Sequence, residues 1–554
     1  MNWKILNKTQ RSKEAKFQSE DVIKILLENR GLKTKSEIDE FLNPKHPICF
    51  TAKDLGIDEK ELQKSVKRIK QAIKNNEAII VYGDYDADGI CATAILWESL
   101  YKLTKNVLPY IPERVSEGYG LNKKAIENCK LKIENLKLII TVDHGITANE
   151  KIKYAKELGI DVIVCDHHEL GKEIPQCSAV IHTDKICAAA IAWFLAKTIT
   201  NHPTPNTYLD LVAIATIADL EPLIGINRSL AKFGLEALRK TNRCGLLAIF
   251  NEARLKKEEI DTYHVGYIIA PRLNAMGRME HALESLRLLC TNDCDKAKSL
   301  ADKLGLTNKE RQLLTDETLK QAKLLVAGME GQLPKFLIVD SDQFQEGVIG
   351  LAAGKLVEEF YRPSLVISRG EIYSKASGRS ISGFNIIEAI RAQADLLVDA
   401  GGHPMAAGLT VETVKIDLLR QRLMAEAERQ ITKGMLQKTL FIDLKLPISE
   451  ISDGLWQEIQ KLQPFGLGNY EPNFSSKVIV KSFRTVGNEG KHLKLTLSPS
   501  THQLSPLFSA IGFGMGHMAG SLKVDREIEI AYSLSLNEWN NRQSIELKIK
   551  DLTE

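Results

Sequence analysis

Short apolar runs alternate with helical patterns through the first half of the chain. Four runs are predicted to be strands, at residues 77–82, 136–142, 161–165 and 178–182. Their apolar residues are continuous rather than alternating, which is typical of parallel strands covered by helices on both faces. The first half is therefore predicted to be an α/β domain.

The periodicity changes twice further along the chain. Residues 230–325 have a helical pattern, and a second α/β pattern follows at 334–430. Residues 436–554 alternate apolar and polar positions, as in HLKLTL and EIEIAYSLSL. This period of two predicts half-buried strands in a small barrel or sandwich.

The amino-acid composition is ordinary for a folded protein and excludes few classes of function. Apolar residues make up 44% and charged residues 26% of the 554 positions, which excludes disorder of the whole chain. With 74 Lys and Arg against 71 Asp and Glu, the net charge is +3. A net charge near zero does not exclude a nucleic-acid partner, because binding depends on a local basic groove more than on the net charge of the chain.

Membrane and disulfide signals are weak. The longest apolar stretch, residues 186–196, falls short of the ~20 residues that a spanning helix needs, and the N-terminus lacks the apolar core of a signal peptide. The nine cysteines are scattered without a C-x-x-C pair. We therefore expect reduced thiols, no membrane association and a cytoplasmic location.

The most informative segment is YGDYDADGICAT, which follows the first predicted strand. Asp84, Asp86 and Asp88 alternate, so in an extended chain their side chains point to one side. Carboxylates this close repel one another unless cations neutralise them, and hard divalent ions such as Mg²⁺ or Mn²⁺ prefer such ligands. Gly83 and Gly89 would let the backbone turn tightly around an ion. The alternative is an acidic surface turn.

Two further strand ends carry candidate ligands. Asp143 in TVDHGIT can bridge two metal ions, because a carboxylate has two oxygens. In CDHHE, His167 and His168 would face opposite sides of a strand, so at most one is expected to be a metal ligand, and the other could contact a phosphate or orient a neighbour. A structural, hydrogen-bonded histidine is the alternative. Asp219, after a helical run, would by itself be a helix cap.

Taken in order, these motifs resemble a known family. GDYDADG, TVDHGIT, DHH and ATIADLEPL are similar to the four motifs of the DHH phosphoesterase family, and GGHPMAAG at 401–408 resembles the signature of the DHHA1 domain. RLNAMGRM, EGVIGLAAG, SGRSISGF and QPFGLGNYEP resemble the branch of this family that degrades single-stranded DNA from the 5′ end. The similarity spans nearly the whole chain.

The resemblance implies a fold and a division into domains. The expected fold class is α/β, with a mainly parallel sheet in the DHH domain, linking helices, a second α/β domain and a C-terminal β-barrel of the OB fold. The expected segments are an N-terminal helical segment at 1–70, a DHH domain at 71–230, a helical linker at 231–330, a DHHA1 substrate-binding domain at 331–430 and an OB-fold DNA-binding domain at 431–554.

The resemblance also implies two-metal catalysis, in which two Mn²⁺ or Mg²⁺ ions activate a water that attacks a phosphodiester. The implied metal ligands are Asp84, Asp86, Asp88, Asp143, His167 and Asp219, and the implied catalytic residues are Asp86, Asp88, Asp143, His167, His168 and Asp219. Paired metals stabilise both the attacking and the leaving oxygen. No separate nucleophilic side chain is required.

The DHHA1-like motifs imply a substrate grip. The implied substrate-binding residues are Arg278, Arg379, Ser380, Gly401, Gly402, His403 and Gly408. Turns at the glycines would expose backbone N–H groups that can cradle a phosphate, and the arginines could pair with phosphates. Each arginine alone would be interpreted as an ordinary surface charge.

The C-terminal strands would supply a second DNA contact, because OB folds bind single strands through a basic groove and aromatic stacking. The candidate residues are Lys477, Lys481, Arg484, Lys491, Lys494 and Phe483. The alternative is that these lysines only form the solvated face of the strands.

The implied activity is 5′→3′ exonuclease digestion of single-stranded DNA to 5′-mononucleotides, in recombination and repair. The implied partners are single-stranded DNA, a helicase and a single-strand-binding protein, and the chain is expected to be a monomer. Rival hypotheses are an enzyme of the same superfamily that acts on short oligoribonucleotides or cyclic dinucleotides, and a non-catalytic scaffold. Two departures from the family pattern, His144 and residues 186–192, bear on substrate fit.

Overall fold

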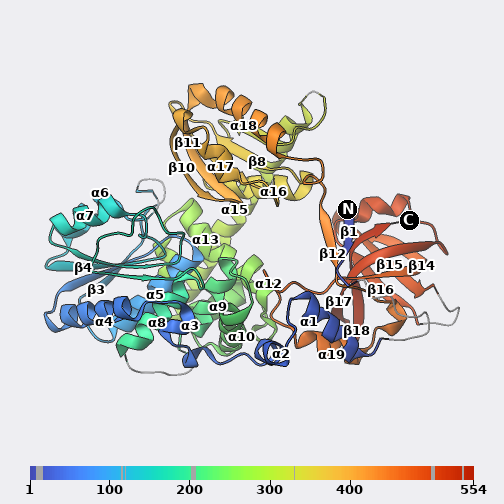
Figure 1. Ribbon diagram of the computed structural model, residues 1–554, viewed down its shortest axis with the longest axis horizontal. Coiled ribbons are helices and arrows are strands. Elements are labelled where there is room, and N and C mark those ends of the chain that lie inside the picture. Colours follow the sequence, from blue (N-terminus) through green and yellow to red (C-terminus); the bar gives the residue numbers. More distant parts are fainter. Residues whose placement is uncertain are drawn as a thin grey trace. The chain divides into compact units, whose positions relative to one another are not determined.

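The protein is described by a computed structural model (Figure 1), which covers residues 1–7, 17–113, 117–118, 120–200, 207–329, 331–500, 506–539 and 542–553. The chain forms two compact units. One consists of residues 46–221 and 229–437, and the other of residues 1–45, 222–228 and 438–554. The N-terminal residues therefore belong with the C-terminal barrel, whereas the predicted segment 1–70 ended later.

The first sheet of the larger unit has five parallel strands in the order β3-β2-β4-β5-β6. Its strands are β2 (Ala78–Tyr82), β3 (Val107–Tyr110), β4 (Leu136–Val142), β5 (Asp161–Asp166) and β6 (Ala179–His182). The prediction of a parallel sheet is confirmed, and the four expected strands lie within two residues of their predicted bounds. The sequence pattern did not indicate β3, which contains Pro109 and an exposed Leu108.

Helices cover both faces of this sheet. The helices are α3 (Ala52–Leu55), α4 (Glu59–Lys74), α5 (Ala87–Tyr101), α6 (Lys123–Lys132), α7 (Asn149–Glu157) and α8 (Ala188–Thr200). Apolar residues of α6 and α7 pack with Ile80, Ile139 and Val162 on one face, while α5 and α8 lie against the other (Figure 1). This arrangement leaves the carboxyl ends of the strands open at one edge, where ligands bind in such folds.

A helical region follows, as predicted. Its helices are α9 (Leu209–Ala218), α10 (Gly225–Lys240), α11 (Cys244–Glu252), α12 (Thr262–His264), η3 (Val265–Ile269), α13 (Ala270–Met279), α14 (Leu283–Cys290) and α15 (Cys294–Ala327). The last part of the predicted helical stretch 230–325 forms α15, which has 34 residues.

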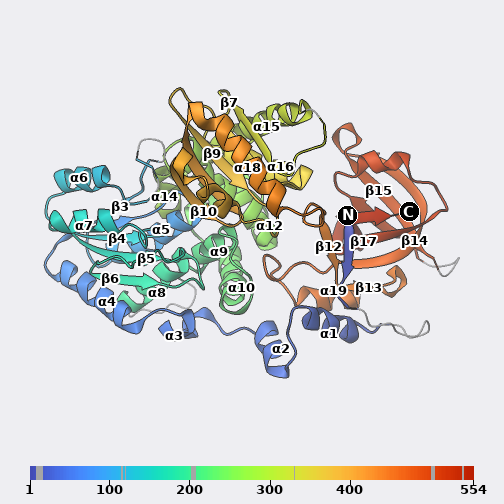
Figure 2. The same ribbon diagram turned by 45° about the horizontal axis from the view of Figure 1, so that its top comes forward.

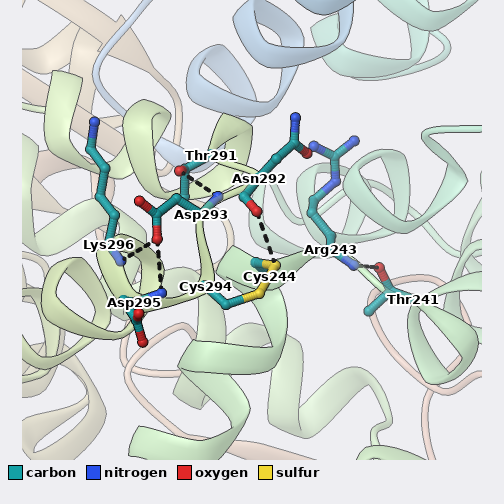
Figure 3. The surroundings of a disulfide bond; sticks show 9 residues. All are labelled: Thr241, Arg243, Cys244, Thr291, Asn292, Asp293, Cys294, Asp295 and Lys296. Carbon is teal, nitrogen blue, oxygen red and sulfur yellow. Dashed lines mark hydrogen bonds between the residues drawn. A yellow bond between two sulfur atoms is a disulfide. The ribbon is translucent and has the colours of Figure 1, made fainter.

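A disulfide in this region corrects the expectation that all thiols are reduced. Cys244 and Cys294, the first residues of α11 and α15, are joined with a Cα–Cα distance of 5.2 Å (Figure 3). The two cysteines are 50 residues apart in the chain. Their spacing gave no signal because only the packing of α11 against α15 brings them together. The other seven cysteines are free.

The second sheet has five strands in the order β10-β11-β9-β8-β7, of which only β7 and β8 are parallel. The strands are β7 (Leu337–Ser341), β8 (Ser364–Ser368), β9 (Tyr373–Arg379), β10 (Leu397–His403) and β11 (Ala406–Glu412). Helices α17 (Ile386–Arg391) and α18 (Ile416–Gln430) cover one face, and α16 (Ile349–Phe360) with the end of α15 covers the other (Figure 2).

The smaller unit contains a closed barrel, because β14 pairs with β17 as well as with β15. The closed ring consists of β14 (Phe474–Val486), β15 (His492–Pro499), β16 (Phe508–Gly512), β18 (Arg542–Thr553) and β17 (Glu527–Trp539). The short strand β13 (Leu444–Lys445) pairs with β14 beside the ring. Helices α1 (Ser19–Asn29), α2 (Lys35–Leu42) and α19 (Asp453–Gln460) share its apolar core, and β1 (Asn2–Ile5) pairs with β12 (Thr439–Ile442). Across the described residues, no helix is both long and apolar enough to cross a membrane.

Candidate functional site

Three carboxylates follow β2 where the chain turns into α5. Asp86 is the N-cap of this helix, and its Oδ1 accepts a hydrogen bond of 3.0 Å from the Gly89 backbone N–H. Asp88 lies in the first turn. The prediction that Asp84, Asp86 and Asp88 alternate along an extended chain is therefore wrong. The helix instead directs Asp88 toward a different set of ligands from Asp84 and Asp86.

Asp88 is buried and held by another helix. Its two carboxylate oxygens accept hydrogen bonds of 2.7 Å each from the backbone N–H groups of Ala188 and Ala189, at the N-terminus of α8. Burial, followed by the negative charge of Asp86, raises the pKa of Asp88 to about 6, although His167 acts in the opposite direction. The segment that departs from the family pattern, residues 186–192, thus supplies the anchor of this carboxylate.

Gly83 and Gly89 allow close packing rather than a tight turn around an ion. Neither glycine has a positive φ. A Cβ on Gly83 would lie 1.9 Å from Oγ1 of Thr93, and a Cβ on Gly89 would lie 2.8 Å from the backbone of Asp84. The loop after β2 can approach α5 only because both positions lack a side chain.

Asp143 occupies the centre of the site. It follows β4 with a left-handed φ of 69°, a conformation that costs an ordinary residue about 1–2 kcal/mol. Its backbone N–H donates to the Cys165 carbonyl over 3.0 Å. One possible metal-binding group combines it with Asp84 and Asp86, and another with His167 and His168. Asp143 is therefore shared by two of the possible metal-binding groups, and its role as a bridging ligand stays a prediction.

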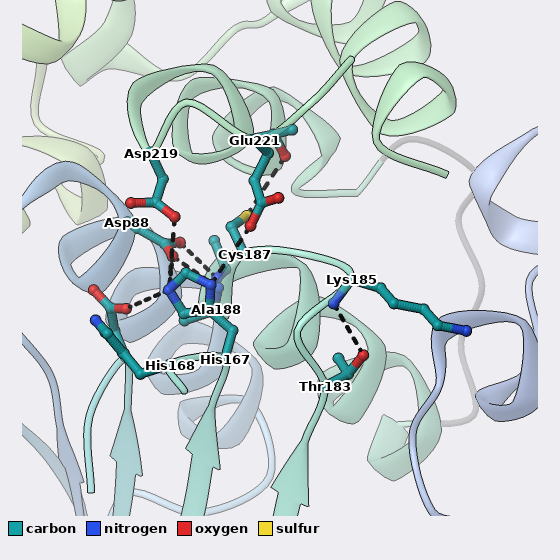
Figure 4. Close-up of polar contacts among 12 residues, drawn as sticks. Asp88, His167, His168, Thr183, Lys185, Cys187, Ala188, Asp219 and Glu221 are labelled. Atoms are coloured by element: carbon teal, nitrogen blue, oxygen red, sulfur yellow. Dashed lines mark hydrogen bonds and ion pairs between the residues drawn. The ribbon is translucent and has the colours of Figure 1, made fainter. Parts of the chain in front are cut away.

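The Nε2 atom of His167 faces three carboxylates, two of which, Asp88 and Asp219, are labelled in Figure 4. It lies 3.3 Å from Asp143, 3.6 Å from Asp219 and 3.8 Å from Asp88. Burial acts to lower the pKa of His167, but its interactions with Asp143 and the other acids outweigh this and raise it to about 12. His167 is thus the histidine placed among the carboxylates.

Asp219 joins this group from the far end of α9, where it is the C-cap residue. It forms a possible metal-binding group with Asp88 and His167. Burial, then the charge of Asp88, raises the pKa of Asp219 to about 8. Only the fold turns this helix-end acid into a candidate ligand.

Asp166, although it also ends a strand, turns away from the metal-binding groups. Its Oδ1 accepts hydrogen bonds from Nδ1 of His168 (2.7 Å) and its Oδ2 accepts one from the Ile146 backbone N–H (2.9 Å). Burial opposes ionisation, but the hydrogen bonds and charge of His168 outweigh it and lower the pKa of Asp166 to about 2. Asp166 therefore orients His168, a role that the sequence reasoning missed.

His144 is tethered rather than placed as a ligand. Burial lowers its pKa to about 4, so the imidazole is neutral near pH 7. Its Nε2 lies 3.0 Å from the Tyr82 carbonyl oxygen and must carry the proton that this acceptor requires. Within the described part of the chain, His144 belongs to none of the possible metal-binding groups. Its hydrogen bond to Tyr82 connects the segment that follows β4, which contains Asp143, to the end of β2.

The donor set fits two hard divalent ions. The possible metal-binding groups contain only carboxylate oxygens and imidazole nitrogens, and the atoms within each group lie within 4.8 Å of one another. For Asp143 as for Asp88 and Asp219, burial and neighbouring carboxylates raise the pKa. Cations between these groups would remove the repulsion that raises the pKa values. Oxygen-rich sites of this kind suit Mg²⁺ and Mn²⁺.

The affinity for Mn²⁺ is expected to rise as the pH increases from about 6 to about 8. Protons compete with the metal for Asp88, Asp219 and His167, and raising the pH removes them. Isothermal titration calorimetry across this pH range, in two buffers of different ionisation enthalpy, measures the affinity and the number of protons released. An affinity that does not change with pH would contradict the ligand assignment.

A groove of about 600 Å³ extends from these acids to the second sheet. The predicted residues along it are Asp84, Asp86, Asp143, His168, Asp219, Arg278, Arg379, Gly401 and Gly408. Lys375, which the sequence reasoning did not select, lines it as well. The groove thus joins the candidate metal ligands to three basic side chains, of which Lys375 pairs with Glu346, another lining residue, over 2.7 Å.

Arg379 lacks a carboxylate partner among the described residues, although it is largely buried. Its Nη1 donates to Oγ of Ser377 (3.2 Å) and to the Gly378 carbonyl (2.8 Å), and burial lowers its pKa. Arg278 donates to the Gly347 carbonyl over 3.4 Å. Because Arg379 has no neutralising acid among the described residues, it is suited to binding a phosphate.

The glycine motif forms strands, not the phosphate-binding turns expected from the sequence. Gly401 of β10 lies directly opposite Gly408 of β11 in an antiparallel pair. A Cβ on Gly401 would meet nothing within 4 Å. Because neither glycine has a side chain, a substrate can approach the backbone of β10 and β11 closely at this point. Gly402, with φ of 137°, continues β10.

Two other predicted contacts lie outside the groove lining. Ser380 is buried, and its hydroxyl donates to the Phe384 carbonyl over 2.6 Å. The His403 ring stacks near that of His168, with 6.2 Å between ring centroids. Ser380 thus supports the end of β9, whereas His403 stays next to a residue of the groove.

The barrel's candidate cations are mostly paired with acids. Lys477 lies 3.4 Å from Glu527 and Lys481 lies 2.7 Å from Asp525. Lys494 pairs with Glu546. Phe483 is partly buried against the barrel core. A contact of these residues with DNA stays a prediction.

Three known domain families match the chain. The DHH family N-terminal domain matches residues 78–216, the DHHA1 domain matches residues 331–431, and the RecJ OB domain matches residues 442–551.

Two relatives are similar over almost the whole chain. The single-stranded-DNA-specific exonuclease RecJ of Bacillus subtilis is 36% identical over 566 residues, covering 100% of this chain and 70% of the relative. The RecJ of Thermus thermophilus is 32% identical, covering 95% of this chain and 74% of the relative.

Solved structures of the Thermus thermophilus RecJ match the fold. The complex with Mn²⁺ superimposes with a TM-score of 0.83 at 28% identity, covering 100% of this chain and 79% of that chain. The complex with Mg²⁺ has a TM-score of 0.76 at 27% identity, covering 96% and 74%.

The fold and the site together define a metal-dependent phosphoesterase of the DHH type with an added OB domain. Within that class, the chain belongs to the RecJ family.

Proposed function

We propose that this protein is a metal-dependent exonuclease that hydrolyses single-stranded DNA from the 5′ end and releases 5′-mononucleotides, in DNA recombination and repair. The observation that carries the proposal is the position of Asp143, which joins two groups of candidate metal ligands at a groove lined by basic residues. Family membership supports the same activity.

Each group of residues has a distinct role in this reaction. Asp84 and Asp86 would hold one Mn²⁺ or Mg²⁺ ion, Asp88, His167 and Asp219 the other, and Asp143 both. Such ions supply a water of lowered pKa and stabilise the charge on the attacking and leaving oxygens.

The chain's own task is positioning. Asp166 holds His168 at the groove wall through the bond of 2.7 Å. Because Gly401 and Gly408 have no side chains, the backbone of the nucleic acid can pass close to β10 and β11 and reach the metal-binding carboxylates. The basic residues Arg278, Lys375 and Arg379 bind the phosphates and so place the scissile bond at the carboxylates.

Replacing Arg379 by glutamine is expected to raise KM for a single-stranded oligonucleotide about 10- to 100-fold, with a smaller change in kcat. The reason is that a hydrogen bond to a charged phosphate contributes about 1.5–3 kcal/mol. Steady-state kinetics on 5′-phosphorylated and 5′-hydroxyl substrates measure the effect and its dependence on the terminal phosphate. The matched control is Arg369→Gln, which removes an exposed arginine paired with Asp340. An unchanged KM for Arg379→Gln would contradict the phosphate contact.

The direct test of the proposed function is cleavage of an oligonucleotide labelled at one end or the other, with Mn²⁺ or with chelator. Release of mononucleotides from the 5′ end of single strands, but not from blunt duplex, is the expected result. Hydrolysis confined to short oligoribonucleotides or dinucleotides would assign the protein to another branch of the superfamily. Binding without hydrolysis would indicate a scaffold.

We further propose a cytoplasmic monomer that acts with a helicase and a single-strand-binding protein. These partners are inferred from family membership. The five-segment division of the chain likewise remains a prediction. Size-exclusion chromatography with light scattering tests the monomer, and co-purification tests the partners.

A further inference from the structure

We propose that Glu221 is a positioning residue of the metal site, which orients His167 by accepting a hydrogen bond from its Nδ1–H group. Glu221 follows Asp219 by two residues and was not selected from the sequence. The inference rests on the metal site of the proposed function, but it does not depend on which substrate is cleaved.

The backbone at the end of α9 places two acids against one histidine. The Glu221 N–H donates to the Thr216 carbonyl (3.1 Å) and the Leu220 N–H donates to the Ile217 carbonyl (3.3 Å), the two bonds of a Schellman turn. Leu220 occupies the left-handed position of this turn with φ of 59°, where glycine is the usual residue. The turn therefore presents both Asp219 and Glu221 to the same imidazole.

The two ring nitrogens of His167 meet different acids. Nε2 faces the candidate metal ligands, and Asp219 is 3.6 Å from it, whereas Nδ1 lies 3.5 Å from Oε1 of Glu221. Figure 4 shows Asp219 and Glu221 on either side of the imidazole. The Glu221 side chain is only 11% exposed. Glu221 is thus well enclosed and approaches the nitrogen opposite the metal-binding groups.

This arrangement has a chemical consequence for a metal-ligating histidine. When Nε2 binds a metal, Nδ1 must carry the remaining proton, and a carboxylate acceptor fixes both the tautomer and the ring orientation and raises the basicity of the ligand. The neighbouring His168 has the same type of support, because its Nδ1 lies 2.7 Å from Asp166. Each histidine of the DHH motif therefore has its own carboxylate partner.

The experiment measures Mn²⁺ binding by electron paramagnetic resonance in the full chain without DNA. Glu221→Ala is expected to weaken Mn²⁺ affinity about 10- to 100-fold, the usual effect of removing such a partner. Glu221→Gln keeps an acceptor oxygen and loses only the charge, so its loss should be smaller. Leu220→Gly is the matched control, since it preserves the turn and the position of both acids, and its affinity should equal that of the unmodified protein.

A double-mutant cycle with His167→Ala distinguishes positioning from direct binding. Once His167 is absent, Glu221→Ala should add no further loss of Mn²⁺ affinity. A full additional loss would show that Glu221 acts without His167 and would overturn the proposal, as would unchanged affinity in folded Glu221→Ala. If that variant does not fold, the same cycle with Glu221→Gln decides. Failure to cleave DNA leaves these outcomes unaffected, so the two proposals can fail separately.

Discussion

Asp143→Asn is expected to lower the rate of DNA hydrolysis by about 10³-fold or more while the fold remains intact. Removing one group that stabilises transition-state charge typically costs about 10²–10³-fold, and Asp143 belongs to two of the three groups of candidate ligands. Asparagine preserves the shape of the side chain but cannot carry the charge that two cations require. Single-turnover cleavage of an end-labelled oligonucleotide at saturating Mn²⁺ measures the loss.

The same substitution should stabilise the protein when chelator is present. Burial and the charges of Asp88 and Asp86 raise the pKa of Asp143 above its value in the unfolded chain. A raised carboxyl pKa destabilises the folded state progressively as the pH increases from about 4, so at pH 7 the neutral asparagine avoids a repulsion that the native residue experiences. The melting temperature in EDTA should therefore increase.

Asp161→Asn is the matched control for both measurements. Asp161 lies at the amino end of β5, at the opposite edge of the same sheet, and pairs with Arg68 over 2.6 Å. The Asp161→Asn variant should cleave DNA at the rate of the native protein. Near-normal turnover by Asp143→Asn would refute the two-metal assignment, and a lower melting temperature in EDTA would refute the proposed repulsion.

Arg228→Ala is expected to destabilise the barrel-containing unit by at least ~3 kcal/mol. Arg228 is 1% exposed and packs over the Phe41 ring, 3.8 Å from its centroid. Its guanidinium donates to the carbonyls of Phe41 (2.7 Å), Leu462 (2.9 Å) and Gln463 (2.8 Å). Alanine would leave the Phe41 and Gln463 carbonyls without these donors, at about 1–3 kcal/mol each, and would remove the packing over the Phe41 ring. The Leu462 carbonyl would keep a bond of 2.8 Å from the Asn469 amide.

Hydrogen exchange locates the effect of Arg228→Ala. Peptides that include residues 461–463 should exchange faster, because their opening free energy falls. Arg228→Lys should recover little of the lost stability, since a single ammonium group cannot donate to the three carbonyls in the geometry of the planar guanidinium. Arg239→Ala, which removes an arginine with one bond of 2.7 Å to the Ile260 carbonyl, should have a much smaller effect. Unchanged exchange in Arg228→Ala would contradict the structural role.

Much of the site could be predicted because its residues lie at ends of elements that have clear periodicity. The apolar run before Asp84 and the run before Asp143 became β2 and β4, and parallel strands bring their carboxyl ends to one edge. The same logic gave no role for Asp166, since it could not show which way a strand-end side chain turns. Its carboxylate bonds His168 instead of joining the metal-binding groups.

The predictions that failed depended on contacts between distant segments. Gly401 and Gly408 look like turn residues locally, but the pairing of β10 with β11 makes them strand residues. Lys481 looks like a free cation, yet the barrel places it 2.7 Å from Asp525. The pattern of neighbouring residues along the chain cannot indicate such contacts, because the partners are distant in sequence.

The sequence by itself determined most of the element types, the family and most candidate ligands, because periodicity and short motifs depend on neighbours along the chain. Only the tertiary structure decided that Asp219 and Glu221 meet the two nitrogens of His167, that Cys244 bonds Cys294, and that residues 1–45 complete the barrel unit. The physical reason is that burial, charge coupling and hydrogen-bond partners are properties of residues close in space.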